Sequence, residues 1–210
     1  MRSNKKLLAP AKLYLILDAQ ILDHTALLQV LKDSVRGGID IVQLRDKKSS
    51  AKEILDFCGK ALRITKGKIQ FIVNDRADLA LLSGADGLHV GQEDLDYLQA
   101  RRLMGRGKII GVSCQTLAQA LKAQAFGADY IGFGSVFQTQ TKPGRQPMDL
   151  RILRRVVRQV KIPVFPIGGI SRGNIGQLIP LGVQRVAVCR DILLAKDARQ
   201  AVIEFKEILT

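Results

Sequence analysis

The sequence predicts an α/β protein that folds as one (β/α)8 barrel, a TIM barrel, over residues 1–210. Short apolar runs alternate with longer amphipathic stretches about eight times along the chain, which is typical of parallel βαβ units. A doubly wound sheet is the alternative, but it usually has fewer strands and a glycine-rich first turn, which is missing here. Eight repeats in just over two hundred residues therefore favour the barrel.

The elements follow from these runs in chain order. Apolar runs predict strands at 12–18, 39–44, 69–74, 86–90, 108–113, 129–134, 162–169 and 183–189. Apolar residues at helical spacing predict helices at 24–38, 50–65, 77–84, 95–105, 116–127, 151–161, 171–182 and 196–209. Glycines end several of these stretches, which suits a left-handed helix C-terminus. The stretch at 77–84 is short, so a thin wall is expected there.

The chain is strongly basic, with 33 Lys and Arg against 19 Asp and Glu and a formal charge of +14. Such an excess can attract nucleic acid, an acidic membrane or phosphorylated metabolites. Four arginines (Arg151, Arg154, Arg155 and Arg158) fall on one face of a predicted helix, either as a solvated face or as a polyanion-binding face. Aromatic residues are only 5%, tryptophan is absent and no nucleic-acid-binding motif is present, which argues against nucleic acid as the partner.

Cysteine usage and hydropathy indicate the compartment. Cys58, Cys114 and Cys189 are scattered and form no CxxC pair, which argues against a disulfide framework or a zinc site. No apolar run approaches the roughly 20 residues that cross a bilayer. The basic N-terminus is not followed by the apolar segment of a secretory signal. We therefore expect a cytoplasmic protein with no membrane contact.

Polar residues follow the second predicted strand, and in a barrel the chemistry lies at the carboxyl ends of the strands. Gln43 and Arg45 share a strand face, because side chains alternate with period two, and Lys47 continues that side. An arginine fork and a lysine charge suit a pyrophosphate. We expect an anion site here.

Two carboxylates follow the third and fourth predicted strands. Asp75 and Asp94 can approach one another, because these strands are neighbours in a barrel. A few carboxylates, completed by waters and substrate phosphate, are the usual surroundings of Mg²⁺. Each residue could instead be the N-cap of the helix that follows it. Because they lie together beside an Arg/Lys cluster, the metal site is the favoured interpretation.

Later strand ends carry further polar groups. His89 lies inside a strand, where a hydrogen-bonded core histidine is the default over a catalytic role, and Ser113 can bond a substrate or cap a helix. The long loop 134–144 suits a binding loop, and it offers hydroxyl groups and a lysine. Paired glycines at 168–169 allow backbone N–H groups to approach a phosphate, although one of them could serve only a tight turn.

Taken in order, these motifs resemble the thiamine phosphate synthase family. The likeness runs from KLYLILD to VAVCRDI through QLRDK, VNDRADLA, GLHVGQED, GVS, GADYIGFGSVFQTQTK and PIGGI. It implies a transferase with one Mg²⁺ per subunit that joins 4-amino-2-methyl-5-hydroxymethylpyrimidine diphosphate to a thiazole phosphate or its carboxylated form. The products would be thiamine phosphate and diphosphate. Its partners would be small phosphorylated substrates, and a homo-oligomer is left open.

The resemblance also implies residue roles. Asp75 and Asp94 would bind Mg²⁺. A dissociative departure of diphosphate would depend on Arg45, Lys47, Ser113 and Lys142. Substrate contacts are implied for Gln43, Leu44, Arg45, Asp46, Lys47, Asn74, Ser113, Thr139, Gln140, Thr141, Lys142, Gly169, Cys189 and Arg190.

One residue departs from the family pattern. Arg190 stands after the eighth predicted strand, where the family commonly has a small residue such as serine. It could fold over the thiazole phosphate or point outward, and the first is favoured because the site is built for anions.

The closest alternative function is that of a thiazole tautomerase-like relative with the same fold. Such a protein needs no residues that bind a diphosphate, so Asn74–Asp75 and the segment 92–94 count against it.

Overall fold

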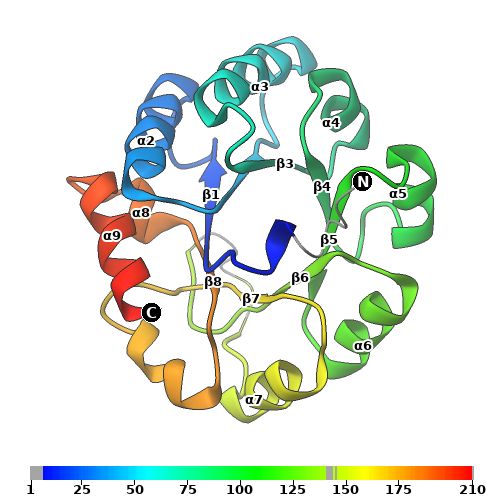
Figure 1. Cartoon of the computed structure of the whole chain (residues 1–210), viewed down its shortest axis with the longest axis vertical. Coiled ribbons are helices and arrows are strands. Elements are labelled where there is room, and N and C mark those ends of the chain that lie inside the picture. Colours follow the sequence, from blue (N-terminus) through cyan, green and yellow to red (C-terminus); the bar gives the residue numbers. More distant parts are fainter. Residues whose placement is uncertain (1–6, 141–143, 145, 210) are drawn as a thin grey trace.

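Eight parallel strands form the centre of the structure, a computed structural model that describes residues 7–140, 144 and 146–209. Neighbouring strands follow chain order, from β1 paired with β2 to β6 paired with β7, and β1 also pairs with β8. A single parallel bridge between Ile167 and Ala187 joins β7 to β8 and closes the ring. The helices surround this ring (Figure 1). The predicted (β/α)8 barrel is confirmed.

The elements lie close to the predicted ranges. The strands are β1 Leu13–Asp18, β2 Ile41–Arg45, β3 Gln70–Asn74, β4 Gly87–Val90, β5 Ile109–Cys114, β6 Tyr130–Phe133, β7 Val164–Pro166 and β8 Val186–Val188. The helices are α2 His24–Gly37, α3 Ala51–Thr65, α4 Ala77–Ser83, α5 Tyr97–Met104, α6 Leu117–Phe126, α7 Leu150–Gln159, α8 Arg190–Leu193 and α9 Ala198–Ile208. Helix α4 is short, as predicted. Within the described part of the chain, no helix has the length and apolar character to cross a membrane.

The segment 171–182 differs from the sequence prediction. It was expected to be an amphipathic helix, but it forms two short 3-10 helices, η1 Ile175–Gln177 and η2 Ile179–Leu181. Pro180 lacks a backbone N–H group and clashes with the preceding turn of a longer helix. Glycines at 173 and 176 further lower the helix propensity. The apolar pattern is kept, because Ile175 and Leu178 are fully buried.

Alternation along the strands produces two cores. In β1, Leu13, Leu15 and Leu17 pack in the large cluster that includes the surrounding helices, while Tyr14 and Ile16 belong to a second cluster inside the barrel. This is the period-two alternation of a strand with both faces buried.

Three aromatic rings fill the inside of the barrel. Tyr14, Tyr130 and Phe165 meet edge to face, with ring centroids 5.5–5.7 Å apart. Leu8 is fully buried in the same inner cluster, just before β1. In Figure 1 the segment before β1, from residue 7 onward, reaches the centre of the ring. The amino-terminal mouth is therefore packed, and open space is left at the carboxyl-terminal mouth.

The basic face of α7 lies in solvent. Leu153 and Val156 are fully buried, whereas the four arginines predicted for the opposite face are exposed. Arg151 has a 91% exposed side chain and pairs with Asp149. This exposure agrees with the solvated-face interpretation, and the polyanion-binding interpretation of the same face stays untested.

The fit of Tyr130 inside the barrel gives a stability prediction. A Cβ added at Gly111, the residue paired with Tyr130 across β5 and β6, would overlap the Tyr130 ring. Gly111→Ala should therefore lower the free energy of unfolding by about 1–3 kcal/mol, measured by urea denaturation. Gly59→Ala in α3 is the control, because its added Cβ meets no atom within 4 Å. It should be neutral or stabilising by about 0.5–1 kcal/mol. Equal effects of the two changes would contradict this account.

Candidate functional site

A cavity of about 420 Å³ opens at the carboxyl-terminal mouth of the barrel. Every strand contributes to its wall, from Tyr14 and Ile16 of β1 to Ala187 of β8. Nine of the sequence-predicted site residues line it: Gln43, Arg45, Asn74, Ser113, Thr139, Gln140, Gly169, Cys189 and Arg190. Thr141 and Lys142 lie outside the described residues. Parallel strands thus bring together, as expected, side chains that are far apart in sequence.

Arg45 is held in place by a buried carboxylate. Its Nη1 donates to Asp18 Oδ2 at 2.8 Å and to Gln20 Oε1 at 2.6 Å. The Asp18 side chain is completely buried, and that of Arg45 is 12% exposed. Two acceptors on one nitrogen fix the direction of the guanidinium, and its other N–H groups can face an anion in the cavity.

Lys47, Asp75 and Asp94 form a charged group beside the cavity. Lys47 Nζ lies 3.0 Å from Asp75 Oδ2. The Asp75 backbone has a left-handed φ of 59°, and its N–H donates to the carbonyl oxygen of His89. Asp94 Oδ2 accepts from the Gly91 N–H at 2.7 Å, and a Cβ added at Gly91 would lie 2.8 Å from this oxygen, so the Asp94 side chain would have to move.

The two aspartates come together as the sequence predicted. Burial and the neighbouring Asp75 carboxyl raise the pKa of Asp94. The N-cap alternatives were wrong: α4 begins after Arg76 without a side-chain cap, and α5 is capped by Asp96, whose side chain accepts from the Gln99 N–H. Among the described residues, no three His, Cys, Asp or Glu side chains cluster as metal ligands. One or two carboxylates are nevertheless what Mg²⁺ commonly takes from a protein, so the pair fits this ion.

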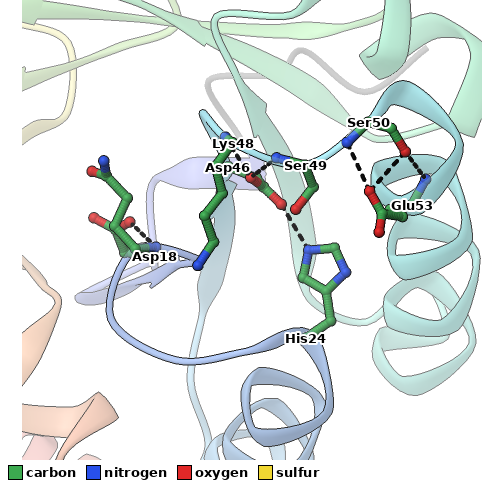
Figure 2. Close-up of polar contacts among 8 residues, drawn as sticks. Asp18, His24, Asp46, Lys48, Ser49, Ser50 and Glu53 are labelled. Carbon is green, nitrogen blue, oxygen red and sulfur yellow. Dashed lines mark hydrogen bonds and ion pairs between the residues drawn. The ribbon is translucent and has the colours of Figure 1, made fainter.

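Leu44 and Asp46, like Lys47, are predicted substrate residues that do not line the cavity. The Leu44 side chain is buried in the outer core, facing the helices. Figure 2 shows the Asp46 side chain directed at His24, whose Nε2 lies 2.7 Å from Asp46 Oδ2. Asp46 Oδ1 also accepts from the backbone N–H groups of Lys48 and Ser49. Asp46 thus fixes the loop between β2 and α3, and a direct substrate contact by either side chain stays a prediction.

Sequence reasoning missed the hydroxyls of Tyr14 and Tyr130 inside the barrel, which join residues that it did name. His89 Nδ1 lies 3.0 Å from the Tyr130 hydroxyl, and His89 Nε2 lies 2.9 Å from Ser113 Oγ. Gln43 Nε2 donates to the Tyr14 hydroxyl at 2.5 Å. The expectation of a hydrogen-bonded core histidine is confirmed, and the same residue also lines the cavity. A tyrosine in each of two predicted strands was the available signal, but strand tyrosines are too common to mark a site.

The turn after β7 requires its glycines. Gly168 and Gly169 have φ values of 104° and 64°, and an added Cβ would overlap Ser135 Oγ or the Gln138 carbonyl oxygen. The next turn is tied to α8, because Arg172 Nε donates to Asp191 Oδ2 at 2.8 Å. Gly168, Gly169, Cys189 and Arg190 all line the cavity, after the neighbouring strands β7 and β8. We call the part of the wall that Gly168, Gly169 and Arg190 form the β7–β8 lobe; its glycine backbone and its arginine are groups that can receive an anion.

Comparisons with known proteins agree with one another. The family described as thiamine monophosphate synthase matches residues 13–192. The chain is 41% identical over 192 residues to the thiamine-phosphate synthase of Clostridium acetobutylicum, with 90% of each chain covered. It is 39% identical over 197 residues to that of Ruminiclostridium cellulolyticum, with 93% and 94% covered. A thiamine phosphate pyrophosphorylase from Pyrococcus furiosus has a TM-score of 0.85 at 34% identity, covering 98% of this chain and 96% of that one.

The Asp46 contacts give a pH-dependent stability prediction. Burial raises the pKa of its carboxyl, but hydrogen bonds from Ser49, Lys48 and His24 outweigh this and lower the pKa from 3.8 to about 2. A folded-state pKa below the unfolded one stabilises the fold above about pH 4, and this stabilisation is lost as the pH falls towards 2. Asp46→Asn should therefore cost about 2 kcal/mol at pH 7 and progressively less below pH 4.

Urea unfolding at pH 7 and pH 3 measures this difference. Asp56→Asn is the control, because Asp56 forms an exposed i, i+4 pair with Lys60. Such pairs contribute little to stability. A constant gap between wild type and Asp46→Asn across this pH range would show that the carboxylate charge is not the cause.

Proposed function

Because the chain belongs to the thiamine monophosphate synthase family, it is a transferase of thiamine biosynthesis, and we propose that the carboxyl-terminal cavity is its active site. In this proposal the cavity binds 4-amino-2-methyl-5-hydroxymethylpyrimidine diphosphate together with a thiazole phosphate. The observation that carries it is the convergence of Arg45, Asn74 and Ser113 in one cavity, next to Lys47 and two adjacent carboxylates.

The reaction proceeds by departure of the diphosphate, formation of a pyrimidine-stabilised methylene cation, and attack by the thiazole nitrogen. The C–O bond to the diphosphate breaks with its electron pair on oxygen, and the new C–N bond uses the nitrogen lone pair. Such a step needs positive charge directed at the leaving group more than it needs a protein nucleophile. Arg45 and Lys47 supply that charge, and Lys142 is predicted to add to it.

Asp75 and Asp94 are the residues that would hold Mg²⁺. When bound, the ion supplies positive charge to the diphosphate oxygens. Protein side chains position the other parts of the pyrimidine diphosphate. Gln43, Asn74 and Ser113 surround the pyrimidine, and Lys47 lies between the carboxylates and the leaving group. The β7–β8 lobe receives the thiazole phosphate.

Direct assay tests this function. Wild-type protein incubated with both phosphorylated precursors and Mg²⁺ should form thiamine phosphate and diphosphate, and omission of either precursor should abolish both products. A protein that fails to form thiamine phosphate in the complete mixture is not this synthase.

A cytoplasmic location and the absence of a nucleic-acid partner stay predictions, and the oligomeric state stays open.

The metal site makes a prediction of its own. Asp75→Asn and Asp94→Asn should each weaken Mg²⁺ binding by at least about tenfold, measured by titration calorimetry with the metal alone. Binding to wild type should also weaken on acidification, beginning above the ordinary carboxyl pKa of 3.8, because the pKa of Asp94 is raised. Asp78→Asn is the control, since Asp78 is an exposed partner of Arg76 in the neighbouring helix. Unchanged Mg²⁺ affinity in both site variants would remove the metal assignment.

Arg45 is expected to act mainly in the transition state. Arg45→Ala should lower kcat/KM by roughly 10²-fold or more, because it removes a charge directed at the leaving diphosphate. Arg151→Ala is the matched control on the solvated face of α7 and should change little. A loss at Arg45 no larger than that at Arg151 contradicts the proposed role.

Arg190 tests which substrate binds at the end of β8. Arg190→Ser should raise the KM of the thiazole phosphate, leave the KM of the pyrimidine diphosphate nearly unchanged, and have a smaller effect at high salt. Steady-state kinetics with each substrate varied in turn make the measurement. A neutral or improved variant means that the side chain does not grip the phosphate.

A further inference from the structure

A continuous chain of hydrogen bonds crosses the inside of the barrel below the cavity. It runs from Gln43 through the hydroxyls of Tyr14 and Tyr130 to His89 and on to Ser113, with steps of 2.5, 2.8, 3.0 and 2.9 Å. Its two ends, on β2 and β5, line the cavity, and so do Tyr14 and His89 between them. The three residues between them are buried, with exposed fractions of 0–7%.

The donors in this row of hydrogen bonds all point the same way, from Gln43 towards Ser113. Gln43 donates through Nε2, so the Tyr14 oxygen accepts at that end. If Tyr130 also donated to Tyr14, the Tyr14 proton would lack a partner among these groups, in a place where it is 2% exposed. An unsatisfied buried donor is unfavourable. Tyr14 therefore donates to Tyr130, and each hydroxyl accepts one hydrogen bond and donates one.

The same direction continues through the imidazole. Tyr130 donates to His89 Nδ1, so a neutral His89 carries its proton on Nε2 and donates to Ser113 Oγ. The Ser113 hydroxyl proton is then directed to the cavity. At the other end, the Gln43 amide is held by its nitrogen, so that Oε1 is left to accept from a ligand.

We propose that Tyr14, Tyr130 and His89 are positioning residues that polarise the cavity, presenting an acceptor at Gln43 and a donor at Ser113. This pattern selects a 4-aminopyrimidine, whose amino group donates at one end of the ring and whose ring nitrogen accepts at the opposite end. A 4-oxo ring presents an acceptor where the amino group would donate. The preference for a 4-aminopyrimidine rests on the proposed function, whereas the donor direction of the hydrogen bonds from Gln43 to Ser113 does not.

Nuclear magnetic resonance of the ligand-free protein tests the direction. The sequence has only two histidines, so ¹⁵N-histidine labelling gives two imidazoles, and His24→Gln assigns them. We expect His89 to be the neutral Nε2–H tautomer, and Tyr130→Phe to disturb that tautomer by removing its Nδ1 donor. A neutral Nδ1–H tautomer in wild type overturns the proposed direction.

Titration calorimetry tests the preference for a 4-aminopyrimidine over a 4-oxopyrimidine. Wild type should bind the 4-aminopyrimidine diphosphate more tightly than its 4-oxo analogue. Tyr14→Phe should narrow that preference by about tenfold, because a Gln43 amide released from Tyr14 can turn and donate to the oxo group. Tyr97→Phe is the matched control: it removes a hydroxyl that donates to the Gly127 carbonyl outside the barrel, and it should leave the ratio unchanged. An unchanged ratio in Tyr14→Phe overturns the selection.

Kinetics separate this inference from the proposed function. In an active enzyme, Tyr14→Phe and Tyr130→Phe should raise the KM of the pyrimidine diphosphate about tenfold and leave the KM of the thiazole phosphate unchanged. Equal increases in both would indicate general loosening of the barrel and contradict a positioning role. If wild type makes no thiamine phosphate, the proposed function and the selection fail together, and the tautomer of His89 still decides the direction of the chain.

Discussion

The edge-to-face contacts of Tyr14, Tyr130 and Phe165 determine where the barrel is filled and where it is open. Three rings from three strands occupy the interior above the buried Leu8, so the remaining space lies at the carboxyl-terminal mouth. The rings need small neighbours, and Gly111 supplies one beside Tyr130. Two of the rings also carry hydroxyls, which would be unfavourable here without partners. The floor of the cavity therefore has to be a hydrogen-bonded network as well as an apolar plug.

Charge at the mouth is arranged around groups that cannot move freely. Asp18 is fully buried, and its attraction for Arg45 holds the guanidinium at the end of β2. Removing either partner would leave an uncompensated charge, so the pair constrains the site more than it stabilises the fold. The arginines of α7 form a contrast, because they lie in solvent and their charge is screened. The net charge of +14 thus says less about function than the few cations whose positions are fixed.

The sequence predicted what depends on local pattern and strand order. Gln43, Arg45, Asn74 and Ser113 were placed at the cavity because alternation and parallel pairing fix which side chains reach the carboxyl-terminal mouth. The N-cap role considered as the alternative for Asp94 was wrong, because Asp94 and Asp96 are equivalent by residue type and only the backbone path selects Asp96 as the cap of α5. The link between Tyr14 and Tyr130 spans 116 residues, and no local pattern contains it. Asp46 sits in a predicted motif, yet its loop turns it towards His24.

Lys47 connects the two halves of the proposed site. Burial raises the pKa of the Asp94 carboxyl, and the neighbouring Asp75 carboxyl raises it further. Lys47 offsets part of the repulsion through Asp75, while its own side chain is still 50% exposed. A cation bound by both carboxylates would offset their repulsion in place of Lys47, and it would weaken the ion pair between Asp75 and the Lys47 ammonium. In the proposed function the lysine would then turn to the diphosphate oxygens, which would couple metal binding by the carboxylates to the contact with the leaving group.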